Sequence, residues 1–183
     1  MRVESMSKHF ELLIAGFGGQ GILFTGKFIV YAGMLQGREV SWLPSYGPEM
    51  RGGTANCNVI ISDDSIGSPI VTHPTDLIVM NGPSLDRFED IVVPGGRIFI
   101  DSTLIQRKVK RTDVEAYYIP ATQMAIDAGM QKMANMIMLG KFIKEVDFCS
   151  GDMIDTVLHK NIPPKKANLF DINRRAIDMG LAN

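Results

Sequence analysis

The sequence predicts a three-layer α/β/α sandwich around a mostly parallel, mixed β-sheet. First, short apolar runs alternate with amphipathic stretches along all 183 residues, a pattern typical of sheets with helices on both faces. Second, a Gly-rich turn at residues 16–21 joins the first apolar run to the first helical stretch, as in parallel α/β sheets. Third, 45% hydrophobic and 21% charged residues are the composition of a folded chain with a substantial core.

The first strand is expected at residues 10–15, which are mostly apolar. A helix is expected at residues 21–36, where Gly37 ends it. Apolar residues cover most faces of this helix, so we expect it to be buried against more than the sheet. The second strand follows at residues 39–43.

The middle of the chain alternates as strands do. Residues 54–62 place Ala55, Cys57, Val59 and Ile61 on one side of a strand. Asp63 and Asp64 form a turn, after which a short strand near residues 70–71 is expected to pair back antiparallel. A buried strand at residues 76–81 leads into a short helix at residues 83–88, with Pro83 near its first turn.

The second half begins with the turn Pro94-Gly95-Gly96. Strands are expected at residues 97–101 and 115–119, and the polar stretch at residues 106–113 is either a loop or a sheet edge. Helices are expected at residues 121–130, 132–146, 152–159 and 164–179. The chain has no linker, repeat or low-complexity segment, so we expect one domain over residues 1–183, with residues 1–8 as a candidate disordered end.

The charge and hydropathy of the chain exclude several functions. The net charge of −1, from 19 basic and 20 acidic residues, provides no field that would recruit nucleic acid or an anionic membrane. No apolar run approaches the roughly 20 residues that span a bilayer. The first residues lack the apolar core of a signal peptide. We therefore expect a cytoplasmic protein.

The sequence indicates no catalytic residue and no metal ligand. Cys57 and Cys149 belong to no CxxC pattern and are expected to be buried, reduced thiols. The three histidines have no partner at metal-ligand spacing, and no G-x-S-x-G elbow is present. The methionines are numerous. Candidates for a subunit interface are Met50, Met133, Met136 and Met138. For the methionines in helices, however, we favour a location in the core.

The turn at residues 16–21 is a candidate phosphate or ligand site. Gly16, Gly18 and Gly21 satisfy G-x-G-x-x-G between a strand and a helix, and Gly19 and Gln20 complete the turn. Glycines there allow a sharp turn and bring N–H groups close to an anion at the positive end of the helix. A dinucleotide site also needs an acid at the end of the second strand. The acid in that stretch, Glu39, stands at its beginning, so the NAD interpretation fails.

A second candidate segment follows the second strand, at residues 45–53. Tyr46, Glu49 and Arg51 stand among prolines and glycines that include Gly52 and Gly53. We expect this segment at the same sheet edge as the Gly-rich turn, where ligands of α/β sheets gather. The guanidinium of Arg51 suits phosphate or carboxylate. The alternative is a structural loop in which Glu49 pairs with Arg51 or with backbone amides.

These motifs together resemble the gamma-type subunit of the 2-oxoacid:ferredoxin or 2-oxoacid:acceptor oxidoreductases. In that family a GxGGQG turn is followed by a Tyr-Gly-Pro-Glu-x-Arg-Gly-Gly segment, as at residues 46–53 here. The resemblance extends over residues 68–69, 80–85, 94–96 and 135–140, Asn168, Ala176 and Gly180. Trp42 with residues 50–54 is most similar to the 2-oxoglutarate branch.

The resemblance implies one subunit of a complex with alpha, beta and ferredoxin-like delta subunits. The complex would convert a 2-oxoacid and CoA into acyl-CoA and CO2 and reduce ferredoxin or another acceptor. The chain lacks the Gly-Asp-Gly segment of the beta type and the cysteines of a cluster. Thiamine diphosphate, magnesium and iron–sulfur centres are thus expected on partner subunits, while this subunit assists assembly and CoA binding. The alternative is a free-standing, Rossmann-like nucleotide-binding enzyme that uses the Gly-rich turn.

A short cationic run consists of Arg107, Lys108, Lys110 and Arg111. Such a run is usually a solvated edge. The alternative is a docking patch for an acidic partner such as ferredoxin, or for the phosphates of CoA. Lys160, Lys165 and Lys166 make a similar, weaker case.

Overall fold

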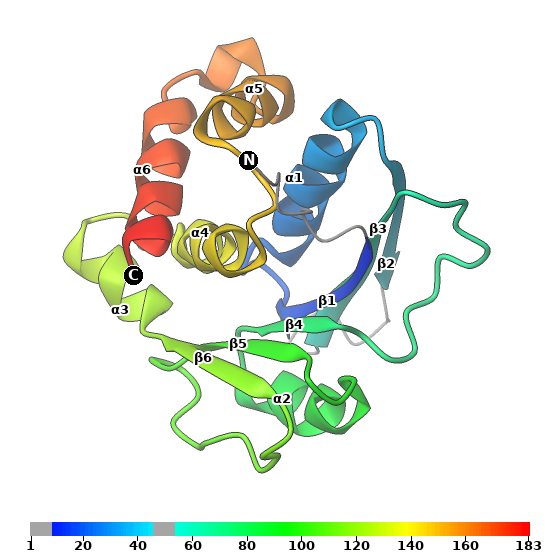
Figure 1. Cartoon of the computed structure of the whole chain (residues 1–183). Helices are drawn as coiled ribbons and strands as arrows, with labels where there is room; N and C mark the ends of the chain where they lie inside the picture. The colour runs from blue at the N-terminus through cyan, green and yellow to red at the C-terminus, as the bar shows by residue number, and fades with distance from the viewer. Residues whose placement is uncertain (1–8, 46–53) are drawn as a thin grey trace, which may run out of the picture.

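The computed structural model describes residues 9–45 and 54–183, which contain a six-stranded sheet of order β2-β3-β1-β4-β5-β6 (Figure 1). The strands are β1 (His9–Phe17), β2 (Glu39–Ser45), β3 (Thr54–Ser62), β4 (Asp76–Val79), β5 (Arg97–Asp101) and β6 (Glu115–Ile119). The pairs β1–β4, β4–β5 and β5–β6 are parallel, whereas β3 pairs antiparallel with both β1 and β2. The predicted mixed, mostly parallel sheet is confirmed. Residues 1–8 lie outside the described residues.

Helices cover both faces of this sheet. They are α1 (Ile22–Leu35), α2 (Gly82–Phe88), α3 (Ala121–Asp127), α4 (Ala134–Val146), α5 (Gly151–Asn161) and α6 (Leu169–Ala182), with short 3-10 turns η1 (Glu89–Ile91) and η2 (Pro164–Lys166). The helix α2 lies on one face, and α1, α4, α5 and α6 lie on the other (Figure 1). The three predicted layers are present, with unequal outer layers.

The alternation of side chains along the strands builds a separate core on each face. Phe10, Leu12 and Ile14 of β1 point into the larger core beneath the thick helical layer, and Leu13 points into the smaller one over α2. The rings of Phe10 and Phe142 meet edge to face with centroids 5.7 Å apart. As expected for a helix buried against more than the sheet, α1 contacts α4 and α5 as well as the strands.

Glycines bring two helices of the thick layer into backbone contact. A Cβ added to Gly140 of α4 would overlap the carbonyl oxygen of Ile177 and lie 2.9 Å from the Cα of Gly180 in α6. A Cβ added to Gly180 would overlap the carbonyl oxygen of Ile137. The small residues therefore set the distance between α4 and α6.

Two expected elements differ from the structure. The strand near residues 70–71 is wrong: the segment is a loop, since Pro69 and Pro74 lack the N–H that a ladder needs and Ile70 is exposed. The helix expected at residues 164–179 is divided into η2 and α6. For residues 106–113, which the sequence left open as a loop or a sheet edge, the structure shows a loop.

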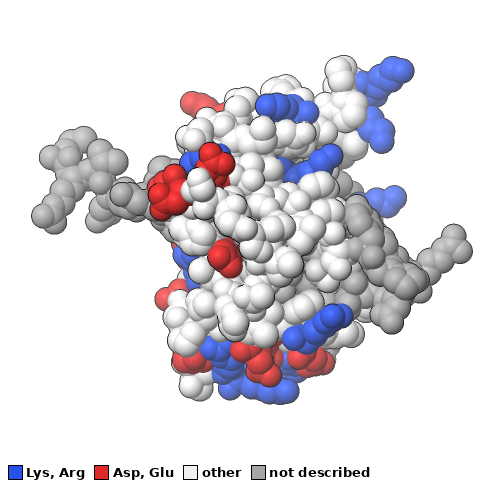
Figure 2. Space-filling view, turned by 90° about the vertical axis from the view of Figure 1, so that its right-hand side faces the viewer, with Lys and Arg blue, Asp and Glu red and all other residues white. Residues whose placement is uncertain are grey.

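The loop at residues 63–75, which joins β3 to β4, projects from the sheet beyond β2 and β3 (Figure 1). Figure 2 looks at this side of the molecule, and its central area is largely uncharged. Acidic and basic side chains crowd together at the lower end of that view, below the sheet. Charge is therefore unevenly spread over this face.

Candidate functional site

The sheet has a topological switch point between β1 and β4. These strands are parallel neighbours, but α1 follows β1 over one face and α2 follows β4 over the other. The two chain segments thus part at the carboxyl ends of the strands, and ligands of open α/β sheets bind in the crevice that this leaves. Residues 16–21 and Met80 stand at this crevice. The Gly-rich turn is therefore at the place in the fold where a ligand site is expected.

The turn depends on two glycines with positive φ and on one close approach. Gly19 has a φ of 92° and Gly21 a φ of 77°, a region that side chains disfavour. A Cβ on Gly16 would lie 2.6 Å from Gln20 Oε1 and 3.2 Å from the Cβ of Met80. Nothing lies within 4 Å of a Cβ on Gly19, so this position faces open space.

Gln20 is a structural member of the turn. Its Oε1 accepts a hydrogen bond from the Phe17 amide at 2.6 Å, and its Nε2 donates one to the Met80 carbonyl at 2.9 Å. The side chain thus joins the carboxyl ends of β1 and β4 across the switch point. Both halves of its amide are in use, so Gln20 shapes the crevice and leaves ligand contact to its neighbours.

Gly21 makes room for α4 as the N-cap of α1. Asn135 Nδ2 lies 3.3 Å from the Gly21 carbonyl oxygen and 3.2 Å from Thr25 Oγ1. A Cβ on Gly21 would lie 2.5 Å from this nitrogen. The three atoms nearest to such a Cβ all belong to Asn135 of α4.

No described side chain caps or neutralises the N-terminus of α1. Gly21 provides no side-chain cap, and the first turn contains no acidic residue. Among the first N–H groups of a helix, those without a partner carry a positive partial charge that favours an anion. This end of α1 borders the crevice, as the phosphate-site prediction requires.

Cavities surround the turn. One, of about 220 Å³, is lined by Gly19, Gln20, Met80, Leu104, Thr122, Gln131, Lys132, Ala134 and Asn135. A second, of about 210 Å³, is lined by Gly19, Gly21, Phe24, Lys132, Met133, Asn135, Leu169 and Asn173. A third, of about 290 Å³, is lined by Phe17, Gly18, Gly19, Gly21, Ile22, Leu23, Phe24 and Ala55. Lys132 lines two of them and is the one charged side chain among these described linings.

Sequence analysis missed Lys132 as a site residue. It stands in the turn before α4, where the sequence predicted the start of a helix, and no local motif marks it. Lys132 is among the residues that line a crevice bordered by the positive end of α1, and both features favour an anion. An arrangement of this kind is suited to an anionic group.

The carboxylate at the end of β5 is hydrogen-bonded to neighbouring groups of the chain. Asp101 is fully buried. It accepts hydrogen bonds from the Thr103 amide at 3.2 Å, the Thr122 amide at 3.3 Å and the Thr122 hydroxyl at 2.5 Å. These bonds hold the start of α3 against β5 and occupy the carboxylate.

Unused polar groups lie where β4 ends. Asn81 caps α2 by accepting the Ser84 amide at 2.8 Å. In the described part of the chain, Asn81 Nδ2 and Ser84 Oγ are buried without hydrogen-bond partners. Burying such groups is costly, and both belong to the segment at residues 80–85 that the sequence singled out.

The second predicted segment lies outside the described residues. This applies to Tyr46, Glu49, Arg51, Gly52 and Gly53. The strands on either side of it are described: Thr54, which begins β3, pairs with Phe17, and Ser45 ends β2 opposite Asn56. The two described residues that flank the segment, Ser45 and Thr54, thus both lie at the carboxyl edge of β1.

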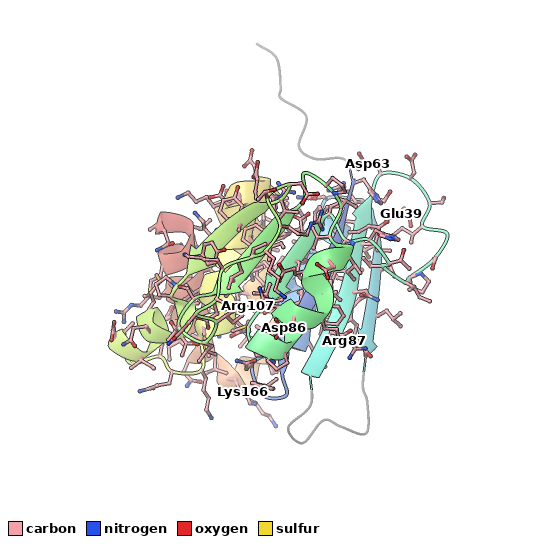
Figure 3. The ribbon with its side chains drawn as sticks, turned by 90° about the horizontal axis from the view of Figure 1, so that it is seen from below. Glu39, Asp63, Asp86, Arg87, Arg107 and Lys166 are labelled. Atoms are coloured by element: carbon pink, nitrogen blue, oxygen red, sulfur yellow. The ribbon has the colours of Figure 1, made fainter. Side chains whose placement is uncertain are left out.

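Glu39 lies at the opposite edge. It pairs with Ser62 at the start of β2, and Figure 3 shows Glu39 and Asp63 together at the end of the molecule away from Lys166. No acidic side chain of the described β2 ends at the crevice.

The cationic run at residues 107–111 is paired within the chain. Arg107 donates to Asp86 at 2.8 Å and lies 2.5 Å from Glu89, whose side chain is 3% exposed. Arg111 pairs with Asp113 at 2.6 Å, and the ammonium of Lys108 lies 3.9 Å from the ring centre of Tyr118. Figure 3 shows Arg107 beside Asp86. The structure supports a solvated edge rather than a docking patch.

The cysteines and methionines are mostly interior. Cys57 is buried and Cys149 half-buried, and both are free thiols. Burial raises the pKa of each to about 12. Met136 and Met138 lie in the core, Met133 packs against it and lines a cavity, and Met50 is outside the described residues. In the residues that are described, no three His, Cys, Asp or Glu side chains gather at metal-binding distance, and no helix is long and apolar enough to cross a membrane.

Sequence comparisons agree over nearly the whole chain. A model of the family described as pyruvate ferredoxin/flavodoxin oxidoreductase matches residues 11–183. The ketoisovalerate oxidoreductase subunit VorA of Methanothermobacter thermautotrophicus is 46% identical over 69% of this chain, but only 26% of VorA is covered. The 2-oxoglutarate synthase subunit KorC of Methanocaldococcus jannaschii is 32% identical, over 84% of this chain and 83% of KorC. The chain thus spans about a quarter of VorA and most of KorC.

Solved structures share the fold. The gamma subunit of a keto/oxoacid ferredoxin oxidoreductase from Geobacter sulfurreducens superposes with a TM-score of 0.79 at 25% identity, over 93% of this chain and 95% of that one. The 2-oxoglutarate:ferredoxin oxidoreductase from Magnetococcus marinus, solved with 2-oxoglutarate, coenzyme A and succinyl-CoA, gives 0.86 at 26% identity, over 96% of this chain and 31% of that one.

Proposed function

The chain belongs to the pyruvate ferredoxin/flavodoxin oxidoreductase family, and on this premise we propose that it is the gamma subunit of a 2-oxoacid:ferredoxin or acceptor oxidoreductase. The near full-length match to KorC and to the Geobacter gamma subunit supports a separate subunit of this size. The KorC relatives favour 2-oxoglutarate as the oxoacid. VorA and the indolepyruvate subunit IorB, which are named for other oxoacids, are relatives as well.

The chemistry of the complex is assigned to other subunits. In the proposed complex, thiamine diphosphate with magnesium would supply the decarboxylation chemistry, and iron–sulfur centres would supply electron transfer to ferredoxin or another acceptor. The residues of this chain do not fit either group, because the sequence has no Gly-Asp-Gly segment and only two cysteines, Cys57 and Cys149. We therefore place these cofactors on alpha, beta and delta partners.

For this chain we propose a part in CoA binding. CoA is polyanionic, and the observation that carries the proposal is that Lys132 lines two cavities beside the open N-terminus of α1. Gly19 leaves space for a phosphate to approach the backbone. Gly16, Gln20 and Gly21 hold the crevice in shape, while Gly18 and Gly19 border its open side.

We propose Arg51 as a second contact for an anion. Tyr46, Glu49, Gly52 and Gly53 belong to the same proposed ligand-binding or interface segment. Support comes from the motif and from its position between Ser45 and Thr54 at the crevice edge. If the guanidinium binds CoA or a partner carboxylate, Arg51→Ala should weaken CoA binding or assembly by about tenfold, or ~1.4 kcal/mol. An exposed ion pair would contribute only about 0–1 kcal/mol.

The test uses the complex assembled from this chain and its partners. Lys132→Ala should raise the KM for CoA at least about tenfold, with kcat and assembly unchanged, and Lys132→Arg should restore most of the affinity. Lys144→Ala, an exposed lysine of α4, is the matched control. An unchanged KM in Lys132→Ala would refute the CoA site, and robust turnover by the isolated chain would refute the subunit assignment.

A further inference from the structure

Two buried asparagines share one cavity beside the Gly-rich turn. Asn135 of α4 is 5% exposed and Asn173 of α6 is 4% exposed. Both line the cavity of about 210 Å³ that Lys132 also lines. The anion contacts proposed above use neither of these side chains. Because buried polar groups are normally hydrogen-bonded, two amides in a cavity wall point to a ligand group that bonds to them.

The orientation of the Asn135 amide is set by its neighbours. The Gly21 carbonyl oxygen lies 3.3 Å from it and Thr25 Oγ1 lies 3.2 Å from it. A carbonyl oxygen can only accept a hydrogen bond, so the amide atom that faces it must be Nδ2. The Thr25 hydroxyl donates its own hydrogen to the same carbonyl at 3.2 Å and is therefore free to accept from Asn135.

The amide of Asn173 is oriented in the same way. Its Nδ2 donates to the Leu169 carbonyl oxygen, one turn earlier in α6, at 2.7 Å. That oxygen also can only accept, so the nitrogen of this amide must face the helix backbone. Both asparagines thus use their donor atoms on backbone carbonyl groups.

The acceptor atoms of the two amides are left to the cavity. Within the described residues, the hydrogen bonds of both side chains are made by Nδ2, and none is made by Oδ1. Neither Oδ1 belongs to the fully enclosed, unpartnered polar atoms of that part of the chain, so each oxygen keeps some exposure. Since the cavity borders both side chains, two acceptor oxygens of fixed orientation lie in its wall.

These oxygens select for one kind of ligand group. An amide oxygen accepts and cannot donate, so the ligand must provide an N–H or O–H group. Phe24, Met133 and Leu169 make much of the remaining wall apolar, while Lys132 lines the same cavity. The ligand that fits is therefore an uncharged group with hydrogens to donate, joined to an anionic group.

We propose that Asn135 and Asn173 recognise N–H groups of CoA through Oδ1, while Lys132 and the N-terminus of α1 bind its phosphates. This inference rests on the proposed function. CoA carries N–H groups in two places, the amides of its pantetheine arm and the amino group of its adenine. A ligand without such groups leaves buried acceptors unpaired and is disfavoured, so the two asparagines distinguish CoA from a simple anion.

The experiment measures CoA-dependent turnover of the complex assembled from this chain and its partners. Asn135→Ala and Asn173→Ala should each raise the KM for CoA about tenfold, with kcat unchanged. Sulfate, a competing anion that has no hydrogen to donate, should keep its inhibition constant in both variants. Lys132→Ala should raise the KM for CoA and the inhibition constant for sulfate together.

Each asparagine has a matched control. Asn161 Nδ2 donates to the Val157 carbonyl oxygen in α5 at 3.2 Å, as Asn173 does in α6, but Asn161 lines none of the three described cavities around the turn. Thr25→Val removes one partner of Asn135 Nδ2 and keeps Oδ1. Asn161→Ala and Thr25→Val should both leave the ratio of the KM for CoA to the inhibition constant for sulfate unchanged.

Two fragments of CoA distinguish the sources of the N–H groups. Pantetheine carries the amides, and the adenosine bisphosphate portion carries the amino group. In each asparagine variant the inhibition constant should rise for the fragment that bonds to the missing amide oxygen and stay constant for the other. Unchanged constants for both fragments would overturn the inference.

The remaining outcomes separate this inference from the proposed function. If Asn135→Ala and Asn173→Ala raise the KM for CoA and the inhibition constant for sulfate by the same factor, the amides only shape the cavity and the inference is overturned. An unchanged KM for CoA in both variants overturns it as well. If sulfate does not compete with CoA in the wild type, or Lys132→Ala changes neither constant, the CoA site of the proposed function is itself wrong.

Discussion

Asn135 Nδ2 donates to the carbonyl oxygen of Gly21 at 3.3 Å, which ties the start of α4 to the N-cap of α1. The same nitrogen lies 3.2 Å from Thr25 Oγ1 in the first turn of α1. One side chain therefore fixes both the carbonyl that precedes the helix and the hydroxyl inside it. Because Asn135 also lines two cavities, this bond couples the packing of α4 to the shape of the crevice.

Gly21→Ala should lower stability more than Gly19→Ala does. Both positions have positive φ, which costs a side chain about 1–2 kcal/mol. A Cβ on Gly21 also meets Asn135 at 2.5 Å, whereas one on Gly19 meets nothing. We expect roughly 1–3 kcal/mol more destabilisation in Gly21→Ala, measured by urea unfolding. Equal losses would mean that Asn135 moves aside freely.

Gly140→Ala should be among the most destabilising single-methyl changes in the chain. The added Cβ would overlap the Ile177 backbone of α6, which cannot rotate away as a side chain does. We expect a loss of about 3 kcal/mol or more. Gly151→Ala is the control, because its Cβ has only Arg174 Nη2 nearby, at 3.8 Å. A shift in melting temperature as small as that of the control would contradict the tight α4–α6 contact.

Arg107→Ala should affect folding and leave partner binding intact. It removes the cation beside Glu89, which is nearly fully buried. The expected loss lies between the roughly 0–1 kcal/mol of exposed pairs and the 3–5 kcal/mol of buried ones. The double variant Arg107→Ala with Glu89→Gln should recover part of it. A raised KM for the electron acceptor with unchanged stability would revive the docking-patch interpretation.

Cys57 should make the fold sensitive to alkaline pH. Burial raises the pKa of its thiol from 9.0 to about 12, so its stabilising contribution is complete below pH 9 and is lost as the pH rises toward 12. The free energy of unfolding should fall by about 1.4 kcal/mol per pH unit from this group above pH 9. Urea titrations of wild type and Cys57→Ala between pH 8 and 10.5 would test this. Parallel pH slopes would contradict it.

Much of the fold could be predicted because its signals are local. The bounds of β3, β5 and β6 agree with the sequence, since alternation of side chains and Gly or Pro at the ends mark short strands. The position of the Gly-rich turn could be predicted because a tight turn between a strand and a helix needs positive φ, which favours glycine. The crevice lies beside that turn. The strand at residues 70–71 failed because exposed apolar residues in a fixed loop resemble a strand in sequence.

The sequence by itself determined the alternation of strands and helices, the Gly-rich turn and the segment at residues 46–53. Hydrophobic periodicity and the glycines and prolines of turns are local features that neighbouring residues reveal. Only the tertiary structure decided that β3 runs antiparallel between β1 and β2, that Lys132 lines the same cavity as Gly21, and that Arg107 is paired with Glu89. These contacts join residues far apart in the chain. Their energy depends on burial and on distance in space, which no local pattern records.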